Sequence, residues 1–312
     1  MASKNENLRK AKKAKNDEFF TRIEDIEKEL VNYQDFFKDK VVYCNCDHPT
    51  ESNFPRYFIL NFEKLGLKKL VSTCFISDSK GWVGTKEKDC EYTIEQLASD
   101  GDFRSEECIE FLKECDVVVT NPPFSLFREY IAQLIEYEKK FLVIGNLNAI
   151  TYKDIFSLIK DNKIWMGTTY FNGGAAYFYG DAKVFDVNKI ANPKNAWVEN
   201  GKLYWRVNGV RWFTNIEHKK RNTPIDIYKT YSAENYPKYD NYDAIEVSKV
   251  VEIPEDYKGV MGVPISFLDK YCPTQFQIVK FRKGDDNKDL SVNGKCPYFR
   301  ILIKRVKNNE TK

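Results

Sequence analysis

The strongest constraint on the fold is the run from Asp116 to Phe124, which reads Asp-Val-Val-Val-Thr-Asn-Pro-Pro-Phe. Three successive valines form an apolar, β-branched run without alternation, which predicts a strand covered on both faces, as in a parallel α/β sheet. The two prolines cannot extend the ladder because neither has an amide hydrogen, and each biases the residue before it toward extended geometry. We therefore expect a buried strand that enters a stiff turn, at the end of the sheet where ligands bind.

This turn presents carbonyl groups beside an aromatic ring. The side-chain oxygen of Asn121 and the backbone carbonyl of Pro122 can accept the two hydrogens of an exocyclic amine, and Phe124 can stack on the ring that carries the amine. The alternative interpretation is a Pro122-Pro123 turn that only ends a strand. Asn before the prolines and Phe after them, at the end of a buried strand, favour an amine-binding site.

Strand-like and helix-like segments alternate on both sides of this run. The expected strands are residues 41–46, 69–76, 116–120 and 140–145, and the expected helices are 17–36, 57–65, 108–113, 126–139 and 153–160. This alternation predicts an α/β fold with a doubly wound, mostly parallel sheet. Farther on, Asn200-Gly201 and Asn208-Gly209 separate β-rich runs at 196–199, 202–207 and 210–216. Asn-Gly predicts tight hairpins, and we expect their antiparallel strands to close the sheet.

The composition changes beyond about residue 221, where Tyr, Pro, Lys and Asp become frequent and periodicity weakens. A chain of 312 residues with 42% hydrophobic content can form one large core or two modest ones. We expect a domain over residues 1–220, which includes a basic N-terminal arm, and a smaller lobe over 221–312. The arm is either a solvated terminus or a phosphate-binding segment.

Charge and cysteine content narrow the class of protein. The 49 basic and 46 acidic residues give a net charge of +3, so a polyanion must meet a local basic face. Eight cysteines without paired spacing, and two histidines without partner patterns, predict reduced thiols and no metal site. No apolar segment reaches the length of a membrane span, and the basic N-terminus lacks the apolar core of a signal peptide. We expect a cytoplasmic protein that does not bind membranes.

The tetrapeptide from Asn121 to Phe124 resembles the catalytic motif of amino-group methyltransferases that use S-adenosylmethionine (SAM). Residues 41–54, 116–130, 236–245 and 258–267 resemble the EcoRI-type family of adenine-specific DNA methyltransferases, and the resemblance covers almost the whole chain. It implies a Rossmann-like SAM-dependent methyltransferase fold and methyl transfer to the N6 amine of an adenine flipped out of duplex DNA. A restriction–modification, phage or epigenetic context is also implied, as is a monomer that binds double-stranded DNA without an obligate protein partner.

The resemblance assigns the catalytic turn and the methionine end of the cofactor site. Asn121, Pro122, Pro123 and Phe124 correspond to the catalytic motif, and Asn121 also faces the cofactor. Asp47, after the first expected strand and next to Cys46, can pair with the methionine ammonium, or it can cap the following helix. The loop lacks Gly-x-Gly, a departure that the EcoRI-type family shares.

Two further segments are implied to hold the cofactor. Phe19, Phe20 and Thr21 resemble the lining of the methionine end, although a capped helix start explains the same residues. Asp102 and Phe103 resemble the segment that holds the cofactor adenine, and the alternative for Asp-Gly-Asp is an ordinary turn. Asp78 follows the second expected strand, where the ribose carboxylate stands in related folds, but it also suits a surface turn.

Residues after about 221 are expected to read the DNA target. Basic clusters at 219–221, 280–283 and 304–307 are candidates for phosphate contacts, or for solvated faces. Two other function classes stay open at this point. One is a methyltransferase that acts on RNA or on a protein glutamine amide, and the other is a catalytically silent nucleic-acid-binding module.

Overall fold

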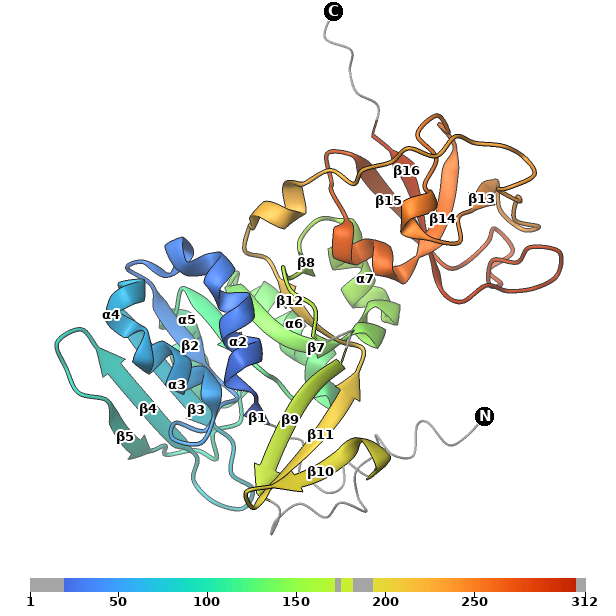
Figure 1. The fold of residues 1–312 in the computed structure, drawn as a ribbon. Coiled ribbons are helices and arrows are strands. Elements are labelled where there is room, and N and C mark those ends of the chain that lie inside the picture. Colours follow the sequence, from blue (N-terminus) through green and yellow to red (C-terminus); the bar gives the residue numbers. More distant parts are fainter. Residues whose placement is uncertain (1–19, 172–174, 182–192, 307–312) are drawn as a thin grey trace, which may run out of the picture. The chain divides into compact units, whose positions relative to one another are not determined.

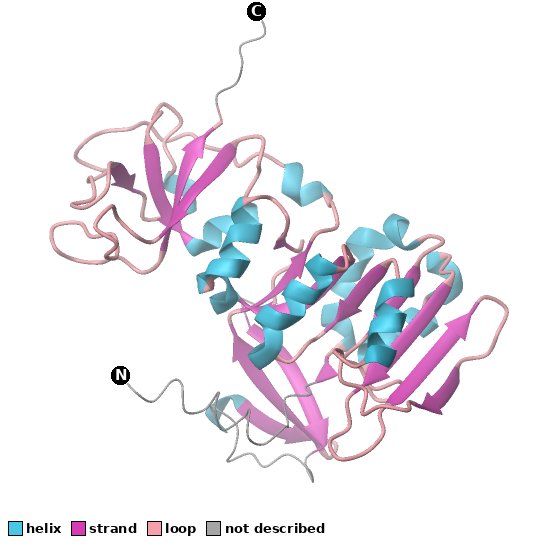
Figure 2. Ribbon diagram, turned by 180° about the vertical axis from the view of Figure 1, so that it is seen from behind, coloured by secondary structure: helices cyan, strands magenta, loops and turns pink. Residues whose placement is uncertain are grey.

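The computed structural model describes residues 20–171, 175–181 and 193–306; Figures 1 and 2 show its ribbon from opposite sides. The chain divides into two compact units. Unit 1 contains Met1–Ala149 and Thr169–Ile216, and unit 2 contains Ile150–Thr168 and Glu217–Lys312. The second unit therefore takes in residues 150–168 from the middle of the chain, which a single boundary near residue 221 does not anticipate.

Unit 1 is built on a sheet whose central strands are parallel, as predicted. Its strands are β2 (Val41–Cys44), β3 (Lys69–Cys74), β4 (Trp82–Glu87), β5 (Thr93–Gln96), β6 (Val117–Thr120), β7 (Lys140–Asn146) and β12 (Val210–Thr214). Within unit 1 they lie in the order β5-β4-β3-β2-β6-β7-β12. The strands β3, β2, β6 and β7 run parallel, whereas β4, β5 and β12 are antiparallel to their neighbours.

Helices cover both faces of this sheet (Figures 1 and 2). They are α2 (Ile23–Leu30), α3 (Asn53–Leu60), α4 (Phe62–Leu65), α5 (Glu106–Glu114) and α6 (Phe127–Glu136). The 3-10 turns η1 (Val31–Phe37), η2 (Phe124–Leu126) and η6 (Pro193–Asn195) also belong to unit 1, and η3 (Leu147–Thr151) spans the sequence boundary at Ala149. Val117 and Val119 share a buried cluster with Ile26 of α2. Val118, which is also fully buried, points to the opposite face because side chains alternate along a strand. The unbroken valine run thus reflects burial on two sides.

Several element boundaries differ from the sequence-based expectation. The helix expected over 17–36 begins only at Ile23, after the short strand β1 (Phe20–Thr21). The helix expected over 57–65 begins at Asn53, where the Ser52 hydroxyl caps it by accepting from the backbone N–H of Phe54. It breaks at Asn61 into α3 and α4. Strands β4 and β5 were not predicted.

The hairpin at Asn200-Gly201 is confirmed, whereas the one expected at Asn208-Gly209 is wrong, because the strands on its two sides lie in different sheets. Only one of the three strands closes the main sheet. That strand is β12, which is antiparallel to β7. The strands β10 (Ala196–Glu199) and β11 (Lys202–Asn208) belong to a separate small sheet with β9 (Ala175–Asp181) and β1, in the order β1-β9-β11-β10. The expectation was wrong for these two strands because β11 pairs along its whole length with β9, a partner that the sequence did not reveal.

Unit 2 has its own sheet and core. Its elements are α7 (Lys153–Lys160), β8 (Trp165–Met166), η7 (Lys219–Asn222), β13 (Ala244–Glu246), η8 (Val250–Glu252), β14 (Val260–Pro264), η9 (Ile265–Lys270), β15 (Phe276–Phe281) and β16 (Arg300–Arg305). The sheet order is β13-β14-β16-β15, and only β13 and β14 are parallel. Long irregular connections join the strands. Across the described ranges of both units, no helix is long and apolar enough to cross a membrane.

Candidate active site

The turn from Asn121 to Phe124 leaves the carboxyl end of β6, which lies between the parallel strands β2 and β7. Pro122 is buried, and the other three residues are half-buried. Pro123 holds an extended backbone (φ −56°, ψ 122°), and Phe124 begins η2 with its ring packed against the core cluster of unit 1. A central strand and two prolines therefore fix the carbonyl-rich turn at the edge where parallel sheets bind ligands.

Asp47 lies in the loop after β2 and is joined directly to the end of β6. Its carboxylate accepts hydrogen bonds from the Ser52 hydroxyl and, at 2.5 Å, from the Thr120 hydroxyl. Burial raises the pKa of Asp47 to about 7, although both hydrogen bonds act to lower it. No Lys or Arg of the described chain forms an ion pair with this carboxylate. The helix-cap alternative does not apply, because Ser52 caps α3.

Strand β1 lies beside this network. The Asn53 side chain, which follows the Asp47 partner Ser52, donates to the backbone carbonyl of Thr21 at 2.8 Å. The hydroxyl oxygen of Thr21 is buried and has no hydrogen-bond partner within the described ranges. Phe20 is half-buried, and Phe19 lies outside the described residues. Asn53 thus links Thr21 to the start of α3, whose capping residue Ser52 is hydrogen-bonded to Asp47.

A second chain of contacts links Cys46 to Phe103. The Tyr130 hydroxyl donates to the side-chain oxygen of Asn45, and the Cys46 thiol lies 3.9 Å from the same oxygen. The Tyr130 ring meets Phe103 edge-on, with centroids 5.1 Å apart. Burial raises the pKa of Tyr130 well above its usual value, so its hydroxyl remains a neutral donor. The sequence did not identify Asn45, Ser52, Thr120 and Tyr130 as site residues, because their roles depend on hydrogen bonds that form only in the fold.

The loop with Asp102 and Phe103 packs tightly on the end of β3. Gly101 has a φ of +81°, and a Cβ there would lie 2.1 Å from the Cys74 carbonyl oxygen. Asp102 is held by Arg104, whose Nε and Nη2 donate to its two oxygens at 2.8 and 2.6 Å. Burial raises the pKa of Asp102, but the hydrogen bonds from Arg104 outweigh it and leave the pKa below its usual value. The Asp102 carboxylate therefore already has a cationic partner, while the Phe103 ring is buried.

Asp78 is set apart from these contacts. It is exposed, has a φ of +60° and accepts a 2.8 Å hydrogen bond from the adjacent Ser77 hydroxyl. This geometry is that of a surface turn. Across the described ranges, no group of three or more His, Cys, Asp or Glu side chains is placed to hold a metal ion.

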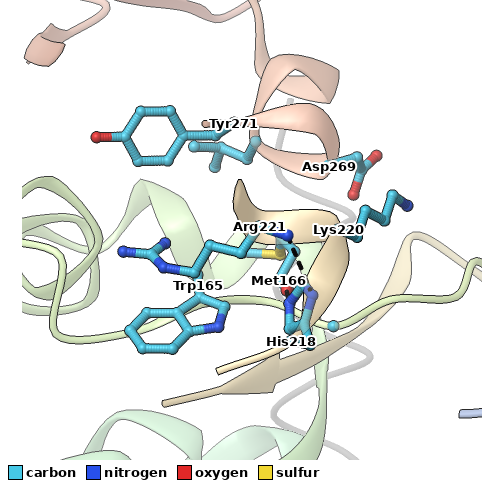
Figure 3. Close-up of a pocket in the computed structure, with 9 residues that line it drawn as sticks. Trp165, Met166, His218, Lys220, Arg221, Asp269 and Tyr271 are labelled. Carbon is cyan, nitrogen blue, oxygen red and sulfur yellow. Dashed lines mark hydrogen bonds between the residues drawn. The ribbon is translucent and has the colours of Figure 1, made fainter. Parts of the chain in front are cut away.

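In unit 2, the basic cluster at 219–221 is partly buried around a small pocket (Figure 3). The Arg221 guanidinium stacks on the Trp165 ring at 3.7 Å and donates to the Asn162 side chain at 3.1 Å. Lys220 donates to the Thr168 carbonyl at 3.0 Å. These contacts attach the start of Glu217–Lys312 to Ile150–Thr168, which explains why both segments belong to one unit. For Arg221 they indicate a structural role, and not the exposed phosphate contact that its sequence suggested.

Comparison with known proteins identifies the family. The family model described as adenine-specific methyltransferase EcoRI matches residues 7–96 and 83–306. Similar proteins include the Type II methyltransferase M.EcoRI of Escherichia coli (48% identical, over 96% of both chains) and M.MgeORF184P of Mycoplasma genitalium (40% identical, over 95% of this chain and 98% of the other). M.MpnI of Mycoplasma pneumoniae is 37% identical over 96% of this chain and 98% of its own. No solved structure matches.

The family match and the fold agree with each other. The model spans nearly the whole chain, and each of these relatives is covered over almost its full length. The sheet with parallel central strands is the fold that the resemblance implied. This chain belongs to the EcoRI family of adenine-specific methyltransferases.

Proposed function

We propose that this protein transfers the methyl group of SAM to the N6 amine of an adenine that is flipped out of duplex DNA at a specific sequence. Membership of the family makes it an adenine-specific Type II DNA methyltransferase. One observation carries the chemistry. The Asn121 to Phe124 turn follows a buried central strand. The hydroxyl of the last residue of that strand, Thr120, donates a hydrogen bond to the buried carboxylate of Asp47.

The residues near this turn fit SAM. Asp47 is a buried carboxylate without a cationic partner in the described ranges, and the SAM methionine end carries an ammonium group. The buried Thr21 hydroxyl lacks a partner there and can bond the same end of the cofactor. We assign Phe20, Thr21, Cys46 and Asp47 to the methionine end. Phe103 is assigned to the adenine end as an apolar wall.

When bound, SAM supplies a methyl group on a positively charged sulfur. The protein's own contribution is to position the acceptor and polarise it. The Asn121 side-chain oxygen and the Pro122 carbonyl accept the two amine hydrogens, which raises the nucleophilicity of the nitrogen, and Phe124 stacks on the base. Because the prolines fix these acceptors beforehand, no reorganisation is needed as charge develops, and no nucleophile from the protein is required.

The substrate geometry requires a second task. The adenine amine lies inside the base pair of a duplex, so an enzyme that acts on it must extrude the base. Selecting one adenine among many requires contacts to neighbouring base pairs. We assign this reading of sequence to unit 2, which carries its own sheet, core and long surface connections.

Modified-base sequencing tests the proposal directly. Genomic DNA is sequenced from a methylation-free bacterial host that expresses the wild-type chain, Asn121→Ala or Asn32→Ala. Asn32 is an exposed residue of η1, and its side chain bonds only backbone carbonyls, so it is the matched control. We expect N6-methyladenine at one sequence for the wild type and the control, and none for Asn121→Ala. Methyl groups found only in RNA, in protein or on cytosine would overturn the proposal.

The same variant has a quantitative signature in purified protein. Asn121→Ala removes an acceptor that matters most in the transition state, so single-turnover methyl transfer should fall about 100- to 1,000-fold. Affinity for SAM, measured by calorimetry, should change little. Equal rates for Asn121→Ala and Asn32→Ala would refute the role of Asn121.

A further inference from the structure

Near its end, the connection between β15 and β16 in unit 2 carries an exposed tyrosine, Tyr298, whose ring packs against other aromatic rings. Tyr298 is 65% exposed, and its ring stacks on Phe299 with centroids 4.7 Å apart and planes 22° apart. The ring centroids of Phe299 and Phe281 lie 6.0 Å apart, and those of Phe281 and Phe156 of α7 lie 5.0 Å apart. The Arg282 guanidinium lies 4.2 Å from the Phe299 ring centroid. A continuous series of rings thus leads from α7 to a surface ring.

The backbone at Tyr298 is also fixed. Nη1 of Arg300 donates to the Tyr298 carbonyl at 2.6 Å, while Nη2 of the same guanidinium donates to Glu246 at 2.6 Å. The side chains of Arg300 and Glu246 are only 12% and 9% exposed. The Tyr239 hydroxyl donates to Glu246 as well. A buried ion pair contributes little net stability, but it fixes geometry, and here it fixes the residue that carries the exposed ring.

The hairpin just before Tyr298 is anchored in a similar way. Asn293 and Gly294 form its turn, with φ values of 51° and 73°. The Asp240 carboxylate accepts from their backbone N–H groups at 3.0 and 2.9 Å, and from the Ser291 hydroxyl at 2.9 Å. The hydrogen bond from the Gly294 N–H is the largest of the effects that lower the pKa of Asp240. Lys295 follows this turn, is exposed and forms no ion pair with other described residues.

The charge around this surface suits a polyanion. Residues 280 to 300 contain six Lys or Arg and three Asp. Asp289 is already paired with Arg282 and Lys283, and these partners lower the pKa of its carboxyl to about 2. Tyr298 and Lys295 are therefore left facing solvent on a net positive segment. An exposed aromatic ring three residues from an exposed lysine, both on a fixed backbone, is a combination that can contact a base edge and a nearby phosphate with little loss of conformational entropy.

We propose that Lys295 and Tyr298 form a DNA-contact surface, in which the Tyr298 ring contacts a base of the target duplex and Lys295 binds a neighbouring phosphate. This inference rests on the proposed function, which assigns the reading of sequence to unit 2. Glu246 and Arg300 act as positioning residues, since they hold the Tyr298 backbone without reaching the DNA.

The test compares DNA binding by four forms of the full-length protein that differ at exposed positions. Tyr298→Ala, Tyr298→Phe and Lys295→Ala are measured against Tyr228→Ala, the matched control. Tyr228 is 66% exposed in the same unit, and among the described residues no aromatic ring stacks on it; the Lys229 ammonium lies over its ring, at 5.4 Å from the centroid. The probe is a duplex that contains the methylated sequence found by sequencing, and a scrambled duplex reports non-specific binding.

We expect Tyr298→Ala to weaken binding to the specific duplex about 10- to 100-fold, because a contact of the ring with a base edge is lost. Binding to the scrambled duplex should change much less. Tyr298→Phe keeps the ring and should retain most of the affinity. Lys295→Ala should weaken binding to both duplexes by a similar factor. It should also make the slope of log affinity against log salt shallower by about one.

The outcomes separate this inference from the function on which it rests. If the wild type neither binds nor methylates any DNA, the proposed function fails. If the wild type methylates its sequence while Tyr298→Ala and Lys295→Ala bind DNA as well as Tyr228→Ala does, this inference alone is overturned. Unfolding temperature and SAM affinity should match the wild type in all variants, since each residue is exposed. Unequal SAM affinity would mean that the loss is structural and would also overturn the contact role.

Discussion

Two buried carboxylates, Glu246 in unit 2 and Asp47 in unit 1, differ in their partners. Glu246 in unit 2 is paired with Arg300 and also accepts from Tyr239. Among the described residues, Asp47 in unit 1 accepts only from the hydroxyls of Ser52 and Thr120, and burial raises its pKa to about 7. Within those residues the first network includes a cation, whereas the second does not. Glu246 is therefore part of a structural ion pair, whereas the environment of Asp47 suits a positively charged ligand.

Arg300→Ala should give the largest effect on stability. It leaves the Glu246 carboxylate buried without its cation, and removing one partner of a buried ion pair typically costs about 3–5 kcal/mol. Chemical denaturation monitored by tyrosine and tryptophan fluorescence measures the free energy of unfolding. Lys304→Ala, at an exposed position on the same strand, is the control and should have little effect. If Arg300→Ala lowers the free energy of unfolding no more than Lys304→Ala does, the ion pair of Arg300 and Glu246 does not have the structural role given to it here.

Asp47→Ala should have a smaller effect on stability but a clear effect on the cofactor. Ser52 and Thr120 each lose a buried acceptor, and an unsatisfied buried hydroxyl costs about 1–3 kcal/mol. Asp47→Asn keeps an acceptor for one or both hydroxyls but removes the charge. We expect both variants to bind SAM more weakly, and only Asp47→Ala to unfold much more readily. If Asp47→Asn binds SAM as tightly as the wild type, Asp47 has a positioning role alone.

The smallest effect expected is a change in protonation. A SAM ammonium beside Asp47 favours the carboxylate and lowers its pKa from about 7, so binding should release part of one proton near pH 6.5 and strengthen as pH rises through 7. Calorimetry in two buffers of different ionisation enthalpy measures the release. Asp47→Asn should lack it. In the free protein the sign is opposite for folding: the raised pKa favours the folded state at low pH, and this contribution is lost as pH rises from about 4 to 7.

Features encoded locally could be predicted from the sequence. The Val117–Thr120 strand, the turn after it and the Asn200-Gly201 hairpin follow from β-branching, proline and positive φ, which depend only on neighbouring residues. Helix α7 has the predicted bounds, Lys153–Lys160, because its apolar positions repeat with helical spacing.

Features that depend on distant segments could not be predicted. Asp47 and Thr120 are 73 residues apart in sequence, and Asn45 and Tyr130 are 85 apart. Their hydrogen bonds exist only because β2 and β6 are neighbours in the sheet. The membership of residues 150–168 in unit 2 is another case, since it depends on contacts with distant residues such as those of Trp165 with Arg221 and of Phe156 with Phe281. Charge alone gave no sign that Arg221 is buried.

The close approach of Gly101 to Cys74 bears on how proteins of this kind can diverge. Any other residue at Gly101 places a Cβ 2.1 Å from a backbone oxygen, in a φ region that L-residues rarely adopt. A single substitution there cannot be absorbed by a side-chain adjustment and must displace the loop with Asp102 and Phe103. The loop therefore cannot accept a substitution at Gly101 while it keeps its present conformation. A family member with a larger residue at the corresponding position must have rebuilt the loop as a whole.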